Sequence, residues 1–116
     1  NLTNNNKMGY YTIFKLSAKD SEITDDMKKE LSTINSYYFD NMNLIDELVE
    51  GWFEAKWYDY VDNMKMLSLK FPTTVFILEG DGEENDDMWV AYFMNGKVQY
   101  EKAKITYNYF DPNKLV

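Results

Sequence analysis

The spacing of apolar residues alternates between strand-like and helix-like patterns, beginning with a strand and a helix. Large apolar residues between Met8 and Ser17 occupy both sides of the chain, which is typical of an interior strand. Met27, Leu31 and Ile34 then recur at intervals that place them on one face of a helix. Because Thr24 can cap this helix, we expect it to begin directly after that residue.

The middle of the chain predicts a short helix and a short strand. Asn43 can cap a helix from Leu44 to Glu50, and Gly51 can end that helix in a left-handed conformation. The residues from Trp52 to Trp57 are expected to follow as a short strand.

A third helix has the clearest helical pattern in the chain. Asp59 is placed to cap it, and Asp62 lies in its first turn. Pro72 ends it, because the residue before a proline avoids helical geometry. Four apolar residues share one face of this helix: Tyr60, Met64, Leu67 and Phe71.

Further strands are expected after the third helix. The continuous apolar run within Thr73–Glu79 is typical of a central strand, and Met88–Met94 forms the next strand. Asn95-Gly96 suits a type I′ turn, which predicts a hairpin with a partner strand from Lys97 to Thr106. Tyr107 to Val116 is expected to be a loop or a packed tail.

The same pattern predicts a core between a sheet and its helices. The residues expected to lie in or beside this core are Tyr11, Ile13, Phe14, Leu31, Met64, Leu67, Val75, Ile77, Val90 and Tyr92. Because Ile77 lies within the apolar run of the central strand, its truncation to alanine is expected to cost about 2–5 kcal/mol.

Several short motifs follow one another in the second half of the chain. They are Lys56-Trp57-Tyr58-Asp59, Phe71-Pro72, Leu78-Glu79-Gly80-Asp81-Gly82-Glu83-Glu84, Asp87-Met88-Trp89 and Asn95-Gly96-Lys97-Val98. In these motifs the chain resembles the YubB-like ferredoxin-like domain, a family found in phages, plasmids and other bacterial mobile elements. The resemblance implies an α+β fold with helices on one face of a mostly antiparallel sheet, and it implies no established activity. The predicted strand order departs from a strict ferredoxin pattern, because the hairpin follows the last helix.

Composition and charge narrow the remaining choices. The 116 residues suit one α+β domain from residue 8 to 116, after a disordered leader or cloning remnant at residues 1–7. The chain has no Cys, His or Arg, so it lacks a thiolate, a side chain that ordinarily titrates near neutrality and a bidentate phosphate clamp. A net charge of −8 disfavours direct binding to nucleic acid. No apolar run approaches the roughly twenty residues of a membrane span. Together with the resemblance to a family of bacterial mobile elements, this predicts a cytoplasmic protein of a bacterial host.

Acidic residues are concentrated between Glu79 and Asp87, with two glycines and no cation. Three interpretations are open: a solvated hairpin loop, a Ca²⁺ or Mg²⁺ site, and a surface that occupies a basic groove on another macromolecule. The spacing is not that of an EF-hand loop, and we expect neither a metal nor a cofactor.

Aromatic residues gather at Trp52, Phe53, Trp57, Tyr58 and Tyr60, with Trp89 and Tyr92 further along. Core packing is expected for Trp57 and Tyr60. A stacking platform for nucleic-acid bases would carry Lys or Arg between its aromatic residues. The neighbours here are instead acidic: Glu50, Glu54, Asp59 and Asp62.

No pattern in the chain supports catalysis. Glu79 and Asp87 could be considered as the paired carboxylates of a glycoside hydrolase, but nothing places them at a defined separation in a cleft. The serines have no histidine to activate them. We therefore expect a protein that is not an enzyme.

These features, together with the resemblance to a mobile-element family, favour a small acidic interaction protein, namely a phage or mobile-element inhibitor of the anti-CRISPR or anti-restriction type. Its partner would be a host defence protein with a basic groove for nucleic acid. The carboxylates expected to face this partner are Asp59, Asp62, Asp81, Glu83, Glu84, Asp86 and Asp87. The alternative is a structural or regulatory phage protein that acts through an apolar protein–protein or self-association interface, to which Tyr107 and Tyr109 could contribute.

Overall fold

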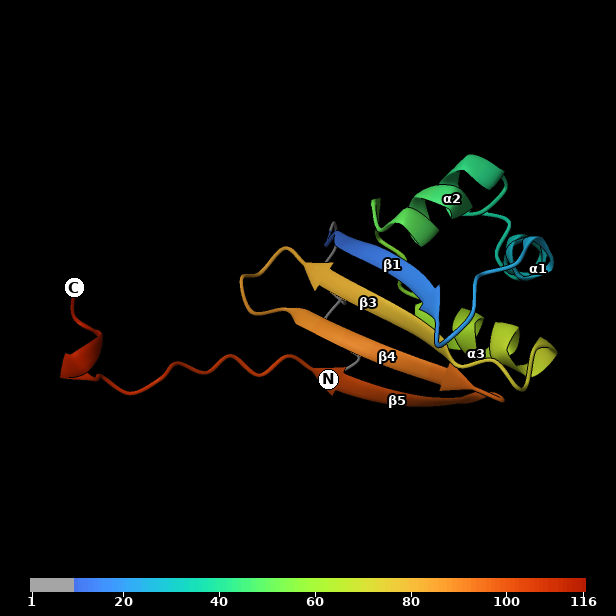
Figure 1. Cartoon of the computed structure of the whole chain (residues 1–116). Helices are drawn as coiled ribbons and strands as arrows, with labels where there is room; N and C mark the ends of the chain where they lie inside the picture. The colour runs from blue at the N-terminus through green and yellow to red at the C-terminus, as the bar shows by residue number, and fades with distance from the viewer. Residues whose placement is uncertain (1–9) are drawn as a thin grey trace.

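A computed structural model describes residues 10–116, which form an antiparallel sheet covered by helices on one face (Figure 1). The five strands have the order β2-β1-β3-β4-β5, and each neighbouring pair is antiparallel. They are β1 (Thr12–Ala18), β2 (Phe53–Ala55), β3 (Phe76–Gly82), β4 (Met88–Met94) and β5 (Lys97–Lys102). The helices are α1 (Asp25–Ile34), α2 (Met42–Glu50) and α3 (Tyr60–Lys70). The predicted α+β class is confirmed, and the arrangement is consistent with a ferredoxin-like fold.

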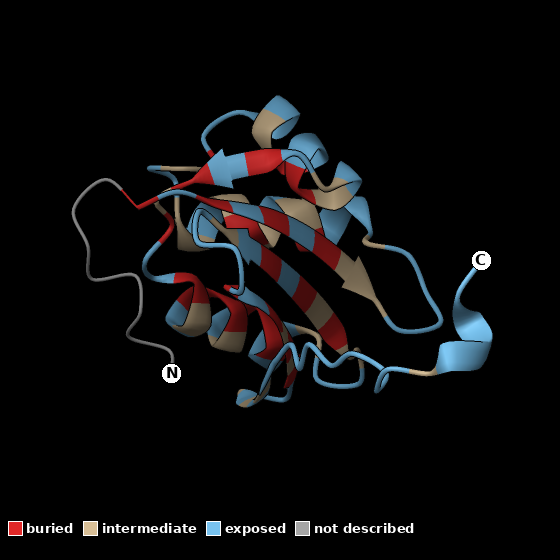
Figure 2. Ribbon diagram, turned by 90° about the vertical axis from the view of Figure 1, so that its left-hand side faces the viewer, coloured by how far each residue is buried: buried red, intermediate tan, exposed pale blue. Residues whose placement is uncertain are grey.

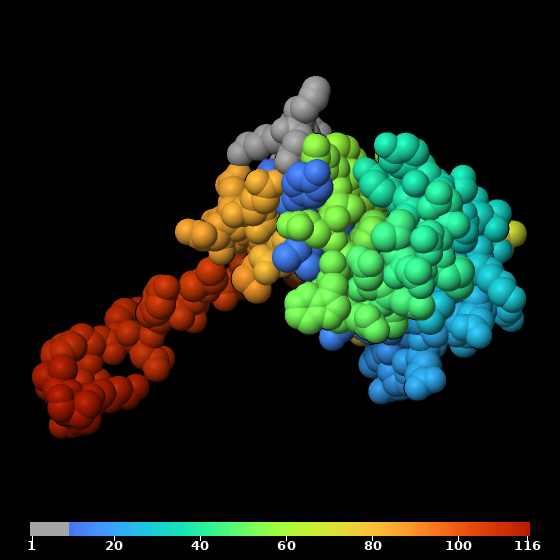
Figure 3. Space-filling view, turned by 90° about the horizontal axis from the view of Figure 1, so that it is seen from above, coloured from blue at the N-terminus to red at the C-terminus, as the bar shows by residue number. Residues whose placement is uncertain are grey.

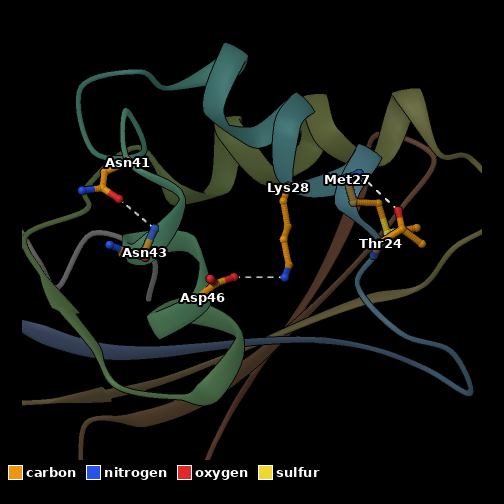
Figure 4. A network of polar contacts seen from close by, with 6 residues as sticks. All are labelled: Thr24, Met27, Lys28, Asn41, Asn43 and Asp46. Atoms are coloured by element: carbon orange, nitrogen blue, oxygen red, sulfur yellow. Dashed lines mark hydrogen bonds and ion pairs between the residues drawn. The ribbon is translucent and has the colours of Figure 1, made fainter.

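Local hydrogen bonds explain where α1 and α2 begin (Figure 4). The Met27 N–H donates to the Thr24 hydroxyl at 3.2 Å, so Thr24 caps α1 as predicted. The prediction that Asn43 caps α2 is wrong, because the Asn41 side chain accepts the Asn43 N–H at 2.8 Å. Helix α2 therefore begins at Met42, two residues before the predicted start.

An ion pair joins helices α1 and α2, and a glycine ends α2. Lys28 Nζ lies 3.0 Å from Asp46 Oδ1, which joins the two helices at their surface. Gly51 ends α2 with a φ of 93°, as predicted for a left-handed cap.

Helix α3 is positioned by a buried amide. Asp59 occupies its N-cap position, but its side chain makes no capping hydrogen bond, so this part of the prediction is wrong. Asn63, inside the helix, instead accepts the Trp57 indole N–H at 2.7 Å and the Asn35 amide N–H at 2.8 Å. These two bonds tie α3 to the segments before it and after α1.

The core lies between the helices and one face of the sheet. Figure 2 shows buried and exposed positions alternating along the strands. Phe14 is at the centre, with its ring 5.2 Å from that of Trp57 and 5.7 Å from that of Tyr60. The prediction of Phe14, Leu31, Met64 and Leu67 as core residues is confirmed.

For the other predicted core residues, the prediction of burial beneath the helices is wrong. Tyr11, Ile13, Ile77, Val90 and Tyr92 belong to the uncovered side of the sheet and are exposed or half-buried, and Val75 precedes β3 and is half-buried. The positions that pack under the helices are their neighbours in sequence, including Leu16, Phe76, Leu78, Trp89 and Phe93. The error has a physical reason: these strands carry large apolar residues on both faces, so alternation does not show which face is covered.

The hairpin of β4 and β5 forms largely as expected. Strand β4 has the predicted bounds, and Asn95 and Gly96 both have positive φ, 49° and 79°. Strand β5 ends at Lys102 rather than at Thr106. Residues 103–116, which we call the arm, are almost entirely exposed and extend away from the sheet (Figures 1 and 3). Apart from a short 3-10 helix at Pro112–Lys114 this segment is irregular, so of the two predicted alternatives the loop is observed and the packed tail is not.

The structure describes residues 10–116 only. The predicted leader at residues 1–7 and the predicted start of the first strand at Met8 are outside this range. Within those residues, none of the helices has the length and apolar character required to traverse a lipid bilayer.

Candidate acidic interaction surface

The acidic segment is divided between a strand and a loop. Glu79 and Asp81 lie in β3, and their exposed side chains are on the uncovered face of the sheet. Only residues 83–87 form the connection from β3 to β4, at one end of the sheet (Figure 1). The hairpin-loop interpretation therefore holds for only part of the segment.

Asp87 fixes the loop from inside. Its carboxylate accepts the Tyr10 O–H, and its carbonyl accepts the Gly82 N–H at 2.8 Å. Asp87 is only 5% exposed, so it does not face outward with the other carboxylates as expected. Its burial is tolerated because it is hydrogen-bonded to a neutral donor. Burial, followed by the bond to Asp87, raises the pKa of Tyr10 to about 12.

The two glycines of this segment make room for side chains. A Cβ at Gly82 would collide with the Asp87 carboxylate and the Tyr10 hydroxyl, and a Cβ at Gly80 would collide with the Trp89 indole. Neither glycine has positive φ, so the change of direction after β3 does not depend on their backbone freedom. They allow close packing against β3 instead.

The remaining loop contacts join it to the beginning of β1. The Tyr11 N–H donates to the Glu83 carboxylate, and the Glu84 N–H donates to the Tyr10 hydroxyl at 3.3 Å. The loop is thus held by the segment that enters β1, and it presents Glu84 and Asp86 as exposed side chains.

Strand pairing adds an acidic residue that sequence reasoning missed. Ile13 pairs with Glu54 of β2 on one side and with Asp81 of β3 on the other. Neighbouring strands are about 5 Å apart, so these two carboxylates flank Ile13 on the same face. Glu54, Asp81 and Glu83 line one hollow of about 140 Å³. No signal in the sequence marks Glu54, because its position depends on how β2 pairs with β1.

We call the following set the acidic edge: Glu54, Asp81, Glu83, Glu84 and Asp86. Within residues 10–116, the one ion pair joins Lys28 to Asp46, so Glu54, Asp81 and Asp86 form no ion pair there. A cation does lie near this end of the sheet, since Lys56 Nζ is 4.8 Å from the centre of the Tyr11 ring.

The structure does not place Asp59 and Asp62 in the acidic edge. Both are exposed, but they belong to the start of α3 in the helix layer, whereas the edge is built from strands and the loop between them. They contribute to the acidic character of the surface from a different layer.

The arrangement gives no support to a metal or catalytic centre. Among the described residues, no three carboxylates converge closely enough to hold a metal ion. Glu79 is exposed on the uncovered face, whereas Asp87 is buried against Tyr10, so the two do not flank one cleft.

The aromatic cluster belongs mainly to the core. Trp57 and Tyr60 are buried, as predicted. The Tyr60 ring stacks on Trp89 with 4.8 Å between ring centres, and burial raises the pKa of Tyr60. Trp52 and Tyr58 are exposed instead.

In comparisons with family models, curated proteins and solved structures, nothing matches this chain. The resemblance to the YubB-like domain stays a prediction from its motifs.

Proposed function

We propose that this chain is a small acidic inhibitor that uses the acidic edge to occupy the basic nucleic-acid groove of a host defence protein. The proposal keeps the anti-CRISPR or anti-restriction class suggested by the sequence and treats the chain as a non-enzymatic protein of phage or mobile-element origin. The observation that supports this proposal is the pairing of β1 with both β2 and β3. It places Glu54 near Asp81 and Glu83, beside the exposed Glu84 and Asp86.

The physical basis is charge complementarity with a groove built for a polyanion. Several carboxylates at one end of a sheet raise the negative potential there more than any of them does alone. Such a surface accelerates encounter with a basic partner and makes binding sensitive to salt. A single exposed ion pair contributes only about 0–1 kcal/mol, so the set acts together.

The test compares two variants of equal charge. The edge variant is Glu54→Lys/Asp81→Lys/Glu84→Lys/Asp86→Lys, which leaves Glu83 and Asp87 to hold the loop. The control variant is Glu22→Lys/Asp40→Lys/Glu47→Lys/Glu50→Lys, at exposed positions away from the acidic edge. Both change the net charge of −8 by the same amount. Circular dichroism checks that each variant is folded.

The measurement is inhibition of DNA binding by purified CRISPR effectors and restriction enzymes across a salt series. Wild type and the control variant are expected to inhibit a member of this panel, less strongly at high salt, while the edge variant loses most of its inhibition. Equal inhibition by the edge variant and wild type would show that the acidic edge does not bind the partner. Equal loss in both variants would show that net charge alone acts.

A second candidate function is a phage protein acting through an apolar interface. One observation favours it: the uncovered face of the sheet and the arm both expose large apolar side chains.

A further inference from the structure

The arm is apolar and touches little of its own molecule. It leaves the sheet after Ala103, whose N–H donates to the Met88 carbonyl at 2.8 Å. Tyr107, Tyr109 and Phe110 are 89%, 97% and 77% exposed. Figure 3 shows the arm projecting from the body. The radius of gyration, 16.4 Å, exceeds the roughly 13 Å of a compact chain of this length. Exposed aromatic side chains gathered within a few residues are typical of an interaction segment.

The arm has the sequence of a β-strand that lacks a partner. Ile105, Tyr107 and Tyr109 alternate with polar Thr106 and Asn108, which is the pattern of a half-buried strand. β-Branched and aromatic residues favour extended backbone. The residues from Lys104 to Phe110 span about 23 Å when extended.

The same sequence disfavours a return of the arm onto its own sheet. Neither Gly nor Pro occurs between Lys97 and Asp111, so no residue with special backbone freedom lies where the arm leaves the body. A chain continuing from β5 in extended form moves away from its own sheet, as Figure 1 shows. The arm is therefore directed away from its own sheet.

The uncovered face of the sheet offers an apolar surface of matching character. We define this open face by its apolar residues Ile13, Ile77, Met88, Val90, Tyr92 and Met94. None of the helices in residues 10–116 lies over it (Figure 1). At one end, Ile77, Tyr92 and Met94 line a groove of about 910 Å³.

The arm and the open face agree in the spacing of their apolar side chains. Side chains two residues apart on a strand are about 7 Å apart, which is the spacing of Tyr107 and Tyr109 and also of Tyr92 and Met94. Lys19 and Lys97 lie beside the groove, and the arm carries Lys104, Asp111 and Lys114, so apolar contact rather than charge supplies the attraction. An extended strand with apolar side chains at alternate positions suits this surface.

We infer that the arm of one molecule packs on the open face of a second copy, which forms an arm-exchanged homodimer. Both complementary surfaces are on the same chain, so a two-fold axis creates the contact twice. Because the chain carries a net charge of −8, two copies repel each other, and added salt strengthens the dimer. This salt dependence is opposite to that of the proposed acidic edge.

The experiment is sedimentation velocity on the full chain over a wide concentration range, at low and high salt. The arm variant is Ile105→Ser/Tyr107→Ser/Tyr109→Ser, and the face variant is Tyr92→Lys/Met94→Lys. The matched control is Tyr37→Ser/Met42→Ser/Met66→Ser, which removes exposed apolar side chains from the helix layer. The arm residues are exposed in the single molecule, so their replacement is expected to leave the fold unchanged.

Wild type and the control are expected to form dimers, more tightly at high salt, and each of the other variants weakens dimerisation at least about a hundredfold. Mixing the arm variant with the face variant restores a heterodimer, because one intact arm then meets one intact face. A wild type that stays monomeric at every concentration overturns the inference. A dimer that survives the arm substitutions also overturns it, and a mixture that fails to associate excludes the arm-on-face contact.

The dimerisation experiment tests this inference independently of the proposed function. The edge variant retains the arm and most of the open face, so its dimerisation at high salt is expected to match that of wild type. Loss of inhibition without loss of the dimer, or the reverse, identifies which of the two proposals fails.

Discussion

On β3, the neighbouring residues Ile77 and Leu78 are both large and aliphatic, yet they lie in different environments. Leu78 is completely buried beneath the helices, whereas Ile77 is half-buried on the open face. The same contrast is repeated on β4, where Trp89 is buried against Tyr60 and Val90 lies half-buried on the open face. Burial in this sheet is therefore decided by which face the helices cover, and side-chain hydrophobicity alone does not predict it.

This difference separates the stabilising part of the molecule from the part available for binding. The covered face joins α1, α2 and α3 into one apolar cluster. The open face and the arm leave apolar area in contact with water, and the acidic edge lies at one end of that face. The substitutions below are expected to affect stability strongly on the covered face and weakly on the open face.

The largest expected effect comes from truncating the covered face. Leu78→Ala should lower the free energy of unfolding by about 2–5 kcal/mol, because it leaves a cavity in a packed core. Ile77→Ala should cost less than about 1.5 kcal/mol, since water already reaches this side chain. Urea unfolding of both variants measures the difference, with Glu79→Ala as an exposed control on the same strand. Equal costs for Ile77 and Leu78 would contradict the distinction between the faces.

An intermediate effect is expected at the buried amide of α3. Asn63→Ala should destabilise the protein by about 1–3 kcal/mol, because it leaves the Trp57 indole N–H and the Asn35 amide without their acceptor. Urea unfolding is again the measurement. Asn43→Ala, at an exposed position on α2, is the matched control and should be close to neutral. If the two variants are equally stable, the buried network does not hold α3 in place.

The smallest effect on the free energy of unfolding is expected from the Tyr10–Asp87 hydrogen bond at the end of the sheet. This effect depends on pH. The folded protein holds the Tyr10 proton more tightly than the unfolded chain, because the pKa of Tyr10 is raised from 10.0 to about 12. The stability from this group is fully present below pH 10 and is lost as pH rises from 10 to 12. Tyr10→Phe should thus be less stable than wild type at neutral pH, and this difference should shrink across that window.

The measurement for Tyr10 is urea unfolding of both proteins at a series of pH values. Tyr38, Tyr60 and Tyr100 also have raised pKa values caused first by burial, so both proteins lose stability at high pH. Comparison with Tyr10→Phe removes that shared loss. A difference that stays constant up to pH 12 would show that Tyr10 does not titrate as the Asp87 contact requires.

Elements that depend on nearby residues could be predicted from the sequence. Thr24 as the cap of α1, Gly51 at the end of α2 and the Asn95-Gly96 turn are set by interactions within a few residues of the chain. The bounds of β4 were predicted exactly for the same reason. The cap of α2 was misplaced because Asn41 and Asn43 are both good capping residues, and only the hydrogen bond distinguishes them.

The candidate site could be predicted only in part. The exposed acids of the β3–β4 connection follow from their composition, but Asp87 is buried because Tyr10, far away in the sequence, supplies its donor. Glu54 joins the acidic edge because β1 lies between β2 and β3, and Asp59 and Asp62 are separated from it because α3 belongs to the other layer.

The sequence by itself determined the class of fold, the net charge of −8 and the absence of thiol, imidazole and guanidinium chemistry. These properties depend on residue identity and on spacing along the chain. Only the tertiary structure decided which face of each strand is buried, which carboxylates share the acidic edge and that the arm lies outside the core. Those outcomes depend on strand register and on the packing of helices against one face, where contacts join residues that are distant in the sequence.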